Sequence, residues 1–463
     1  MSFIKKLFGS SNSHASELRE KDDSPISRRG NEATATPLRP DLEVFFETKA
    51  NMWHPETNPS GQFPLNMAEN NLNWSMMQKK LVEVTKNVPM PKWVSGYTGM
   101  RGDSSFLEAM AQFMTDHLTH VKINPDHLAS LAGATAIIEL TAWILCDAGD
   151  VAVIPAPCYP VYTQDIFSKA NVERFDLITH HHIEEITDGH PLNIHHLEKT
   201  HQELSAKGKR FKMLLITTPD NPTGHIYSEE RLIEIAQWCK DRKIHLVVNE
   251  LYGLSLIDTK HPKISNNYSQ HIEFQSFARV MQNQKSDYLH LIYGLSKDFG
   301  MSGLRVGFLY SLNESLMKAF ANISAPHLVS NYTQWVISEV FRDKRFIKKY
   351  IAKNQKKLTE SCVIVSESLQ KMNIPFVPPR GSLFVWLDMS EFLDANTSEA
   401  ESELWLSLFN ESGVLLTPGV GFGHTKHGQF RLVHPFVNKK TLKEAMKRME
   451  EFVIKKRSGA NIK

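Results

Sequence analysis

The sequence predicts an α/β protein built on a mostly parallel sheet with helices on both faces. Short apolar, β-rich runs indicate buried strands at 151–156, 213–219, 244–250, 289–296 and 306–311. Amphipathic segments such as 229–243 separate these runs and indicate helices. Because strands that alternate with helices pair in parallel, ligands are expected at the carboxyl ends of the strands.

The composition argues against several classes of protein. The 463 residues include 53 Lys and Arg and 51 Asp and Glu, so charge gives no reason to expect nucleic acid or an anionic membrane as a partner. No apolar run reaches the roughly 18 residues that span a bilayer. The four cysteines lie far apart without a CxxC pair, which argues against a disulfide scaffold and a zinc module. We expect a soluble protein of a reducing compartment, the cytoplasm.

The two ends of the chain differ from its middle. Residues 1–40 are polar and short of aromatic residues, so they are predicted to be disordered. The opening MSFIKKLFG is interpreted as a frayed terminus rather than as a membrane anchor. The C-terminal part forms a second α/β lobe, with a long basic helix over about 333–360, strands over 381–389 and 429–435, and a closing helix over 438–453.

The segment YGLSKDFGMSGLRVGF, residues 293–308, is the most informative. Lys297 follows a predicted strand, so its amine is expected where a ligand binds. Such a lysine is either an ordinary exposed side chain or, when buried, an amine that forms a Schiff base with an aldehyde. Arg305 stands between Gly303 and Gly307, a pattern that lets a cation approach a phosphate closely.

This segment resembles the Schiff-base signature of the class I/II aminotransferases, which are pyridoxal 5′-phosphate (PLP) enzymes of fold type I. In detail it is similar to the 1-aminocyclopropane-1-carboxylate (ACC) synthase branch. The similarity runs from about residue 62 to about residue 453. It implies a large PLP-binding domain over roughly 90–330, with a seven-stranded sheet, and a small domain formed by roughly 41–89 and 331–463.

A second motif resembles the family's cofactor-phosphate loop. LAGATAIIEL, residues 131–140, places Ala134 and Thr135 at a turn before a predicted helix. By itself the motif indicates either a simple helix cap or a phosphate site, because N–H groups at a helix start bind phosphate. The resemblance implies that Ala134, Thr135, Ser296 and Arg305 hold the phosphate of PLP. It also implies that Lys297 forms the Schiff base and later takes the Cα proton.

Further motifs resemble the residues that bind the cofactor ring in this family. Tyr159 in PAPCYPVY is implied to stack on the ring, and Asn221 in TTPDNPTG to donate to its O3′ oxygen. VVNELYG places Asn249 and Tyr252 at another strand end, and Tyr252 is implied to hydrogen-bond O3′. Taken singly, a tyrosine is more often a core or turn residue, and a DNP turn is common.

The substrate side also matches the family. Arg431 in QFRLVHP matches the arginine that binds the α-carboxylate of the substrate, although a strand arginine by itself indicates a surface residue. Its planar fork suits both carboxylate oxygens. Glu69 in NMAENNL and Tyr97 in SGYTG match substrate-binding positions of the ACC synthase pattern. In family dimers this tyrosine enters the neighbouring subunit's site, so the resemblance implies a homodimer.

Several positions depart from the family pattern. The family has an aspartate where this chain has Asn249, and the aspartate keeps the ring nitrogen of PLP protonated; an amide supplies no charge, so attenuated or altered catalysis is expected. Glu250 is adjacent, but strand alternation directs it to the opposite face. Gly294 replaces a serine that touches the phosphate. Gln164 replaces an arginine, which puts the sulfonium substrate in doubt.

The sequence therefore predicts a PLP-dependent enzyme that acts on an α-amino acid. One reaction is amino transfer with a 2-oxo acid, and the other is γ-elimination from S-adenosylmethionine. The alternative is a PLP-binding pseudoenzyme with a regulatory or interaction role, since Asn249 and Gly294 both depart from the pattern. The histidine-rich segment 179–201 lacks a metal-ligand spacing, so it is expected to be a helix and loop on the rim and no metal is predicted.

Overall fold

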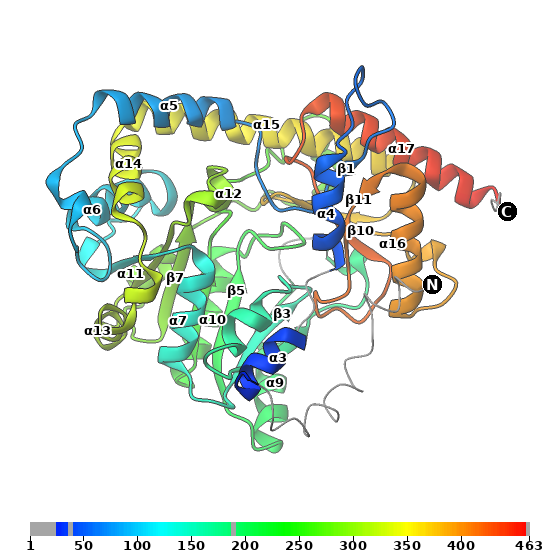
Figure 1. The fold of residues 1–463 in the computed structure, drawn as a ribbon. Coiled ribbons are helices and arrows are strands. Elements are labelled where there is room, and N and C mark those ends of the chain that lie inside the picture. The colour runs from blue at the N-terminus through cyan, green and yellow to red at the C-terminus, as the bar shows by residue number, and fades with distance from the viewer. Residues whose placement is uncertain (1–24, 36–39, 187–190, 460–463) are drawn as a thin grey trace.

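A computed structural model describes residues 25–35, 40–186 and 191–459 (Figure 1). Its largest sheet has the strands β2 (Leu128–Leu131), β3 (Val151–Ala156), β4 (Glu173–Ile178), β5 (Phe211–Thr217), β6 (His245–Asn249), β7 (Leu289–Gly294) and β8 (Gly307–Ser311). They lie in the order β2-β8-β7-β6-β5-β3-β4. β8 is antiparallel to both its neighbours, and the other pairs are parallel. The predicted α/β class with a mostly parallel seven-stranded sheet is confirmed.

Helices cover both faces of this sheet, and further helices form the second lobe. They are α3 (Arg28–Ala35), α4 (Pro40–Ala50), α5 (Trp74–Asn87), α6 (Ser104–Phe113), α7 (Ala134–Leu145), α8 (Tyr162–Phe167), α9 (Ile194–Ala206), α10 (Glu229–Asp241), α11 (Phe277–Asn283), α12 (Leu295–Asp298), α13 (Glu314–Ile323), α14 (Asn331–Arg342), α15 (Lys344–Lys371), α16 (Ser398–Ser412) and α17 (Lys439–Arg457). Within the described ranges, no helix is long and apolar enough to cross a membrane.

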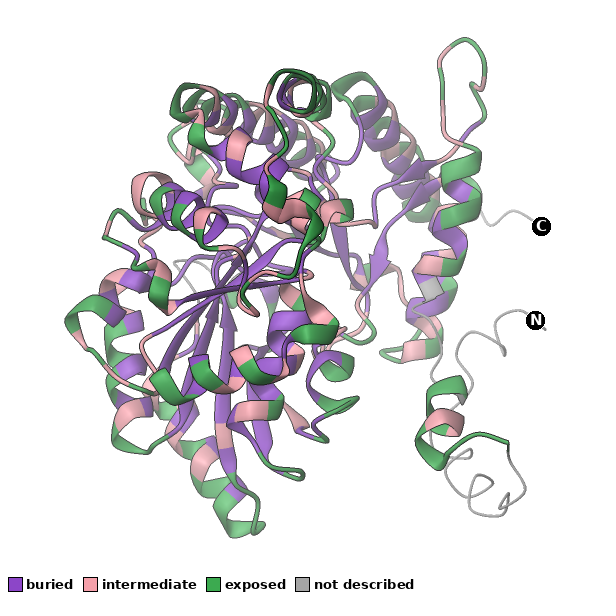
Figure 2. Ribbon diagram, turned by 60° about the vertical axis from the view of Figure 1, so that its left-hand side comes forward, coloured by how far each residue is buried: buried purple, intermediate pink, exposed green. Residues whose placement is uncertain are grey.

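The strands of the large sheet are buried, as Figure 2 shows, except for the half-buried edge strand β4. Alternate residues of β3 enter different hydrophobic cores. Val151 and Val153 join the core under α6, α10 and α11, whereas Ala152 and Ile154 join the core under α7, α8 and α13. This explains why the strands read as continuous apolar runs rather than as alternating ones.

The C-terminal lobe contains a separate antiparallel sheet. Its strands are β12 (Thr417–Pro418), β13 (Gln429–Val433), β10 (Phe384–Asp388) and β9 (Phe376–Val377), in that order. β1 (Phe63–Pro64) pairs in parallel with β11 (Val414–Leu415). An early segment of the chain is therefore part of the C-terminal lobe.

The predicted single helix over about 333–360 is wrong, because two helices cover this region. α14 ends at Arg342 and α15 begins at Lys344. Between them, Asp343 has φ −78° and ψ 80°, and its side chain accepts a hydrogen bond from the N–H of Phe346. An N-cap of this kind starts a new helix and interrupts the old one.

Helices from beyond both predicted limits of the large domain, 89 and 330, pack into the core under α6, α10 and α11. α5 and α14 both pack into the core under the large sheet, to which they contribute Met77, Val84 and Trp335. Both helices were assigned to the small domain, 41–89 and 331–463, but their apolar side chains pack against the large sheet. Helix α15 then carries the chain from this core into the C-terminal lobe (Figure 1).

Two predictions of irregular structure also differ from the fold. Within the predicted disordered tail, Arg28–Ala35 forms α3, whose start is capped where the N–H of Gly30 donates to the hydroxyl of Ser27 at 3.2 Å. The opening MSFIKKLFG lies outside the described residues. The segment 179–201 is not confined to the rim, since His180 is buried against His424 with ring centroids 5.1 Å apart.

Candidate active site

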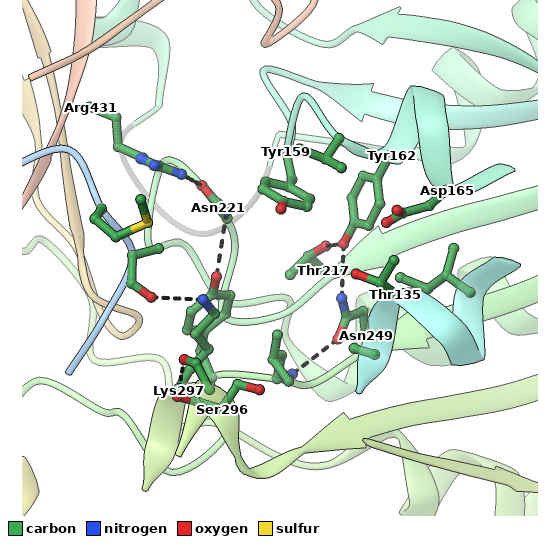
Figure 3. A pocket seen from close by; sticks show the side chains of 18 of the residues that line it. Thr135, Tyr159, Tyr162, Asp165, Thr217, Asn221, Asn249, Ser296, Lys297 and Arg431 are labelled. Carbon is green, nitrogen blue, oxygen red and sulfur yellow. Dashed lines mark hydrogen bonds between the residues drawn. The ribbon is translucent and has the colours of Figure 1, made fainter. Parts of the chain in front are cut away.

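A cavity opens at the carboxyl ends of the parallel strands, between the large sheet and the C-terminal lobe. Its volume is about 220 Å³, and its lining combines apolar side chains with a few convergent polar groups, as in small-molecule and cofactor sites. The residues that line it are Leu42, Met67, Ala68, Ala134, Thr135, Ile138, Tyr159, Val161, Tyr162, Asp165, Thr217, Asn221, Asn249, Leu251, Tyr252, Ser296, Lys297, Ser302, Arg305 and Arg431. Figure 3 shows how the polar side chains converge from separate elements.

Lys297 enters this cavity from α12, the short helix that directly follows β7. Its Nζ donates to the carbonyl oxygen of Ala68 at 2.7 Å. The next residue, Asp298, points the other way and accepts hydrogen bonds from the hydroxyls of Ser255 and Tyr293. Asp298 therefore fixes the start of α12, and the Lys297 amine is held against the backbone of Ala68, which also lines the cavity.

The start of α7 forms one end of the cavity. The helix begins after Gly133, whose φ is 94°. A Cβ atom at Gly133 would lie 2.3 Å from Nη2 of Arg305, so only glycine lets this cation sit at the helix start. Arg305 donates to the carbonyl oxygens of Ser302 and Ala132 at 3.0 and 3.1 Å. Free N–H groups of a helix start beside a guanidinium make a site for an anion.

Hydroxyl groups surround the same end of the cavity. Thr135, Ser296 and Ser302 all line it. Sequence reasoning did not single out Ser302, although it belongs to the same motif as Lys297 and Arg305. Its position three residues before Arg305 is the signal that was available.

Asn249 lies at the end of β6 and is 3% exposed. Its Nδ2 donates to the hydroxyl of Tyr162 at 2.9 Å, and its Oδ1 accepts from the N–H of Leu251 at 3.2 Å. The Tyr162 hydroxyl in turn shares a 2.8 Å hydrogen bond with Oγ1 of Thr217. Burial raises the pKa of Tyr162, so its hydroxyl keeps its proton. Sequence reasoning missed both Tyr162 and Thr217.

Arg431, Asn221 and Tyr252 form a second network on the opposite wall. Nη1 of Arg431 donates to Oδ1 of Asn221 at 3.0 Å, and Nδ2 of Asn221 lies 3.5 Å from the hydroxyl of Tyr252. Arg431 is 1% exposed, and its guanidinium lies 4.6 Å from the ring centroid of Phe384. Burial raises the pKa of Tyr252 well above its ordinary value.

Tyr159 lines the cavity, and its ring meets that of Tyr162 edge to face with centroids 5.3 Å apart. Two other predicted site residues lie elsewhere. Glu69 is outside the set of residues that line the cavity, although the neighbouring Ala68 belongs to it. Tyr97 is 99% exposed and points away from the molecule. One chain therefore assembles the predicted cofactor residues and Arg431, but not Glu69 and Tyr97.

The departures from the family pattern have distinct structural settings. Glu250 lies on the opposite face from Asn249, as predicted, and accepts a 2.7 Å hydrogen bond from the hydroxyl of Ser276. A Cβ atom at Gly294 would lie 2.9 Å from Cδ1 of Leu251, so this side chain occupies the space of the missing serine. Gln164 is exposed and outside the cavity lining, so within one chain its change does not touch the site.

The chain is similar to known proteins over most of its length. The family model for aminotransferase class I and II matches residues 64–449. An ACC synthase of Malus domestica is 30% identical over 422 residues, which are 88% of this chain and 86% of that protein. An ACC synthase of Glycine max is 26% identical over 417 residues, or 87% of this chain and 83% of that protein.

Solved structures share the fold. An archaeal alanine:glyoxylate aminotransferase matches with a TM-score of 0.75 and 18% identity, over 93% of this chain and 98% of that chain. A single mutant of the Thermus thermophilus aspartate aminotransferase matches with a TM-score of 0.74 and 18% identity, over 93% of this chain and all of that chain.

Proposed function

The chain belongs to the aminotransferase class I and II family and is a PLP-dependent enzyme, and we propose that it removes the Cα proton of an α-amino acid with Lys297 as the base. The observation that carries this proposal is the convergence on one cavity of the Lys297 amine, the Arg431 guanidinium and the anion-binding start of α7. These are the groups that an amino acid and a phosphorylated cofactor require.

The residues of the cavity fit PLP. The open helix start at Gly133, with Thr135, Ser296, Ser302 and Arg305 around it, offers N–H, hydroxyl and guanidinium donors for a phosphate. On the far wall, Asn221 and Tyr252 offer donors for the ring oxygen. When bound, PLP supplies an aldehyde that condenses with amines and a ring that withdraws electrons from Cα.

The protein's own groups then have separate tasks. Arg431 binds the α-carboxylate of the substrate through two N–H donors, and its hydrogen bond to Asn221 holds the guanidinium in one orientation. The Lys297 amine exchanges its hydrogen bond to Ala68 for contact with the substrate, from which it takes the Cα proton. Because its pKa is raised, the Tyr252 hydroxyl stays protonated and remains a donor.

Binding of PLP to the purified protein tests this function. Purified protein mixed with PLP is expected to show a visible absorption band, which borohydride abolishes while the cofactor becomes covalently attached to the peptide containing Lys297. The Lys297→Ala variant is the control and is expected to show neither the band nor the modified peptide. A wild-type protein without the band would contradict the role of Lys297.

The fate of the substrate distinguishes two reactions. The ACC synthases at 26% and 30% identity favour γ-elimination from S-adenosylmethionine, which would release ACC. The second candidate is amino transfer, because Asn249 and Gln164 both depart from the ACC synthase pattern. An assay with S-adenosylmethionine and one with amino acids plus 2-oxoglutarate separate the two, and the absence of product from both would contradict both reactions.

The position of Tyr97 supports a homodimer within the same proposal. A tyrosine that is 99% exposed has no packing role in one chain. In the proposed dimer Tyr97 enters the cavity of the partner. Mixing the Tyr97→Ala and Lys297→Ala variants tests this, since subunit exchange would restore one intact site and activity absent from either variant alone. No recovery in a mixture shown to exchange subunits would contradict the shared site.

A further inference from the structure

Asp165 is a buried acid in the cavity wall that the roles proposed above leave unused. It belongs to α8 and lines the cavity near Thr135 and Tyr162 (Figure 3). The side chain is 4% exposed, and its Oδ2 has no hydrogen-bond partner among the described residues. The charge that acts on it is that of Glu139, a second acid.

Other buried acids near this site are satisfied by protein donors. Asp298 accepts from Ser255 and Tyr293, Asp220 accepts from Thr223, and Glu250 accepts from Ser276. Buried carboxylates are normally paired or hydrogen-bonded in this way, because leaving water is costly for a charge. Asp165 differs in that it lines the cavity while its Oδ2 lacks a donor among the described residues, so the missing donor is one that a ligand can bring.

The acid belongs to the same wall of the cavity as Asn249. Tyr162 and Asp165 are three residues apart on α8 and therefore share a helix face. The Tyr162 hydroxyl contacts Asn249 at 2.9 Å, and the charge of Asp165 contributes to raising the pKa of Tyr162. Asn249 itself uses its amide on Tyr162 and on the N–H of Leu251.

We infer that the carboxylate of Asp165 is the counter-charge to the ring nitrogen of bound PLP, in place of the acid absent at position 249. The inference rests on the proposed function. A protonated pyridine nitrogen is a cation with one N–H donor, which matches a buried carboxylate that lacks a donor. If the proton moves within this pair, one N–H bond breaks and one O–H bond forms, and the total charge of the pair is unchanged. Burial also raises the pKa of Asp165 to about 7.

The test is the protonation state of the ring nitrogen, read from the ¹⁵N chemical shift of ¹⁵N-labelled PLP bound to the enzyme. Wild type is expected to hold a protonated nitrogen even though position 249 is an asparagine. Asp165→Asn keeps the shape but removes the charge, so its bound PLP is expected to be unprotonated, with affinity weaker by roughly 10- to 100-fold, the worth of one charged hydrogen bond. The double variant Asp165→Asn with Asn249→Asp is expected to restore the protonated signal.

Matched measurements separate the possible failures. Glu250→Gln removes a buried acid that faces away from the cavity, and it is expected to leave the ring nitrogen protonated. An unprotonated nitrogen in wild type, or a protonated one in Asp165→Asn, would overturn the inference while leaving the proposed function intact. A wild-type protein that does not bind PLP at all would instead overturn the proposed function.

Discussion

Replacing Glu250 by glutamine is expected to change how stability depends on pH. Glu250 turns away from the cavity and is fully buried, with hydrogen bonds from the Ser276 hydroxyl and the Phe277 N–H. Burial raises its pKa from 4.5 to about 8. The folded protein therefore keeps a proton on this carboxyl group at neutral pH.

The sign of the effect follows from proton binding in the two states. Between the unfolded pKa of 4.5 and the folded pKa of about 8, the folded chain binds more protons than the unfolded chain. The free energy of unfolding therefore falls as pH rises, by about 1.4 kcal/mol per pH unit in this window. Across the whole window the loss from Glu250 is on the order of 5 kcal/mol.

Glutamine has nearly the same shape and does not ionise, so Glu250→Gln removes this term. In urea unfolding, wild type and variant are expected to have similar free energies of unfolding near pH 5. As the pH rises toward 8, the wild-type value is expected to fall below that of the variant. Glu451→Gln, at a side chain that is 62% exposed, is the control and is expected to leave the pH dependence unchanged. A stability difference between wild type and Glu250→Gln that stays constant with pH would refute the reasoning.

Further substitutions test the cavity itself. Gly294→Ser is expected to lower stability by about 1–3 kcal/mol in urea unfolding, because the new Cβ would lie 2.9 Å from Cδ1 of Leu251 and 3.0 Å from the backbone carbonyl oxygen of Val306. Arg431→Lys is expected to raise KM for the amino acid at least about tenfold in steady-state kinetics, since lysine lacks the planar fork. Gly133→Ala is expected to weaken PLP binding about tenfold or more in fluorescence titration, since its Cβ would displace Arg305. An unchanged stability, KM or PLP affinity would contradict the role given to the residue replaced in that variant.

The central strands were predictable because they are buried and apolar, whereas the edge strand β4 (Glu173–Ile178) is half-buried and carries charged residues, so it gave no apolar run. The predicted run at 151–156 coincides with β3. The run at 289–296 is longer than β7, which ends at Gly294 where α12 begins. Apolar character continues through Leu295 although the backbone turns into a helix, so a composition signal alone could not locate this boundary. At Asp343 a local cap signal was available, but the helical periodicity around it was the stronger pattern.

The cavity was predictable only where a motif named its residues. Lys297, Arg305 and Asn249 come from recognisable segments, and each lines the cavity. Thr217 lines the cavity because β5 and β6 pair in a register that sets it opposite Asn249. Asp165 lines the cavity because it lies on the same face of α8 as Tyr162. Such placements depend on pairing and packing between distant segments, which local sequence patterns do not contain.

The departures at Gly294 and Asn249 are better understood as coupled changes than as losses. At the first, Leu251 fills the space that a serine side chain would need, so the glycine and the leucine fit each other. At the second, the asparagine amide is engaged by Tyr162 and the backbone of Leu251. A decaying site would leave voids and unpaired groups where residues were lost. Here an acid that lines the same cavity, Asp165, has a side-chain oxygen without a hydrogen-bond partner among the described residues. That arrangement is the one expected if the acid has moved rather than disappeared, and it favours a working catalyst over a pseudoenzyme.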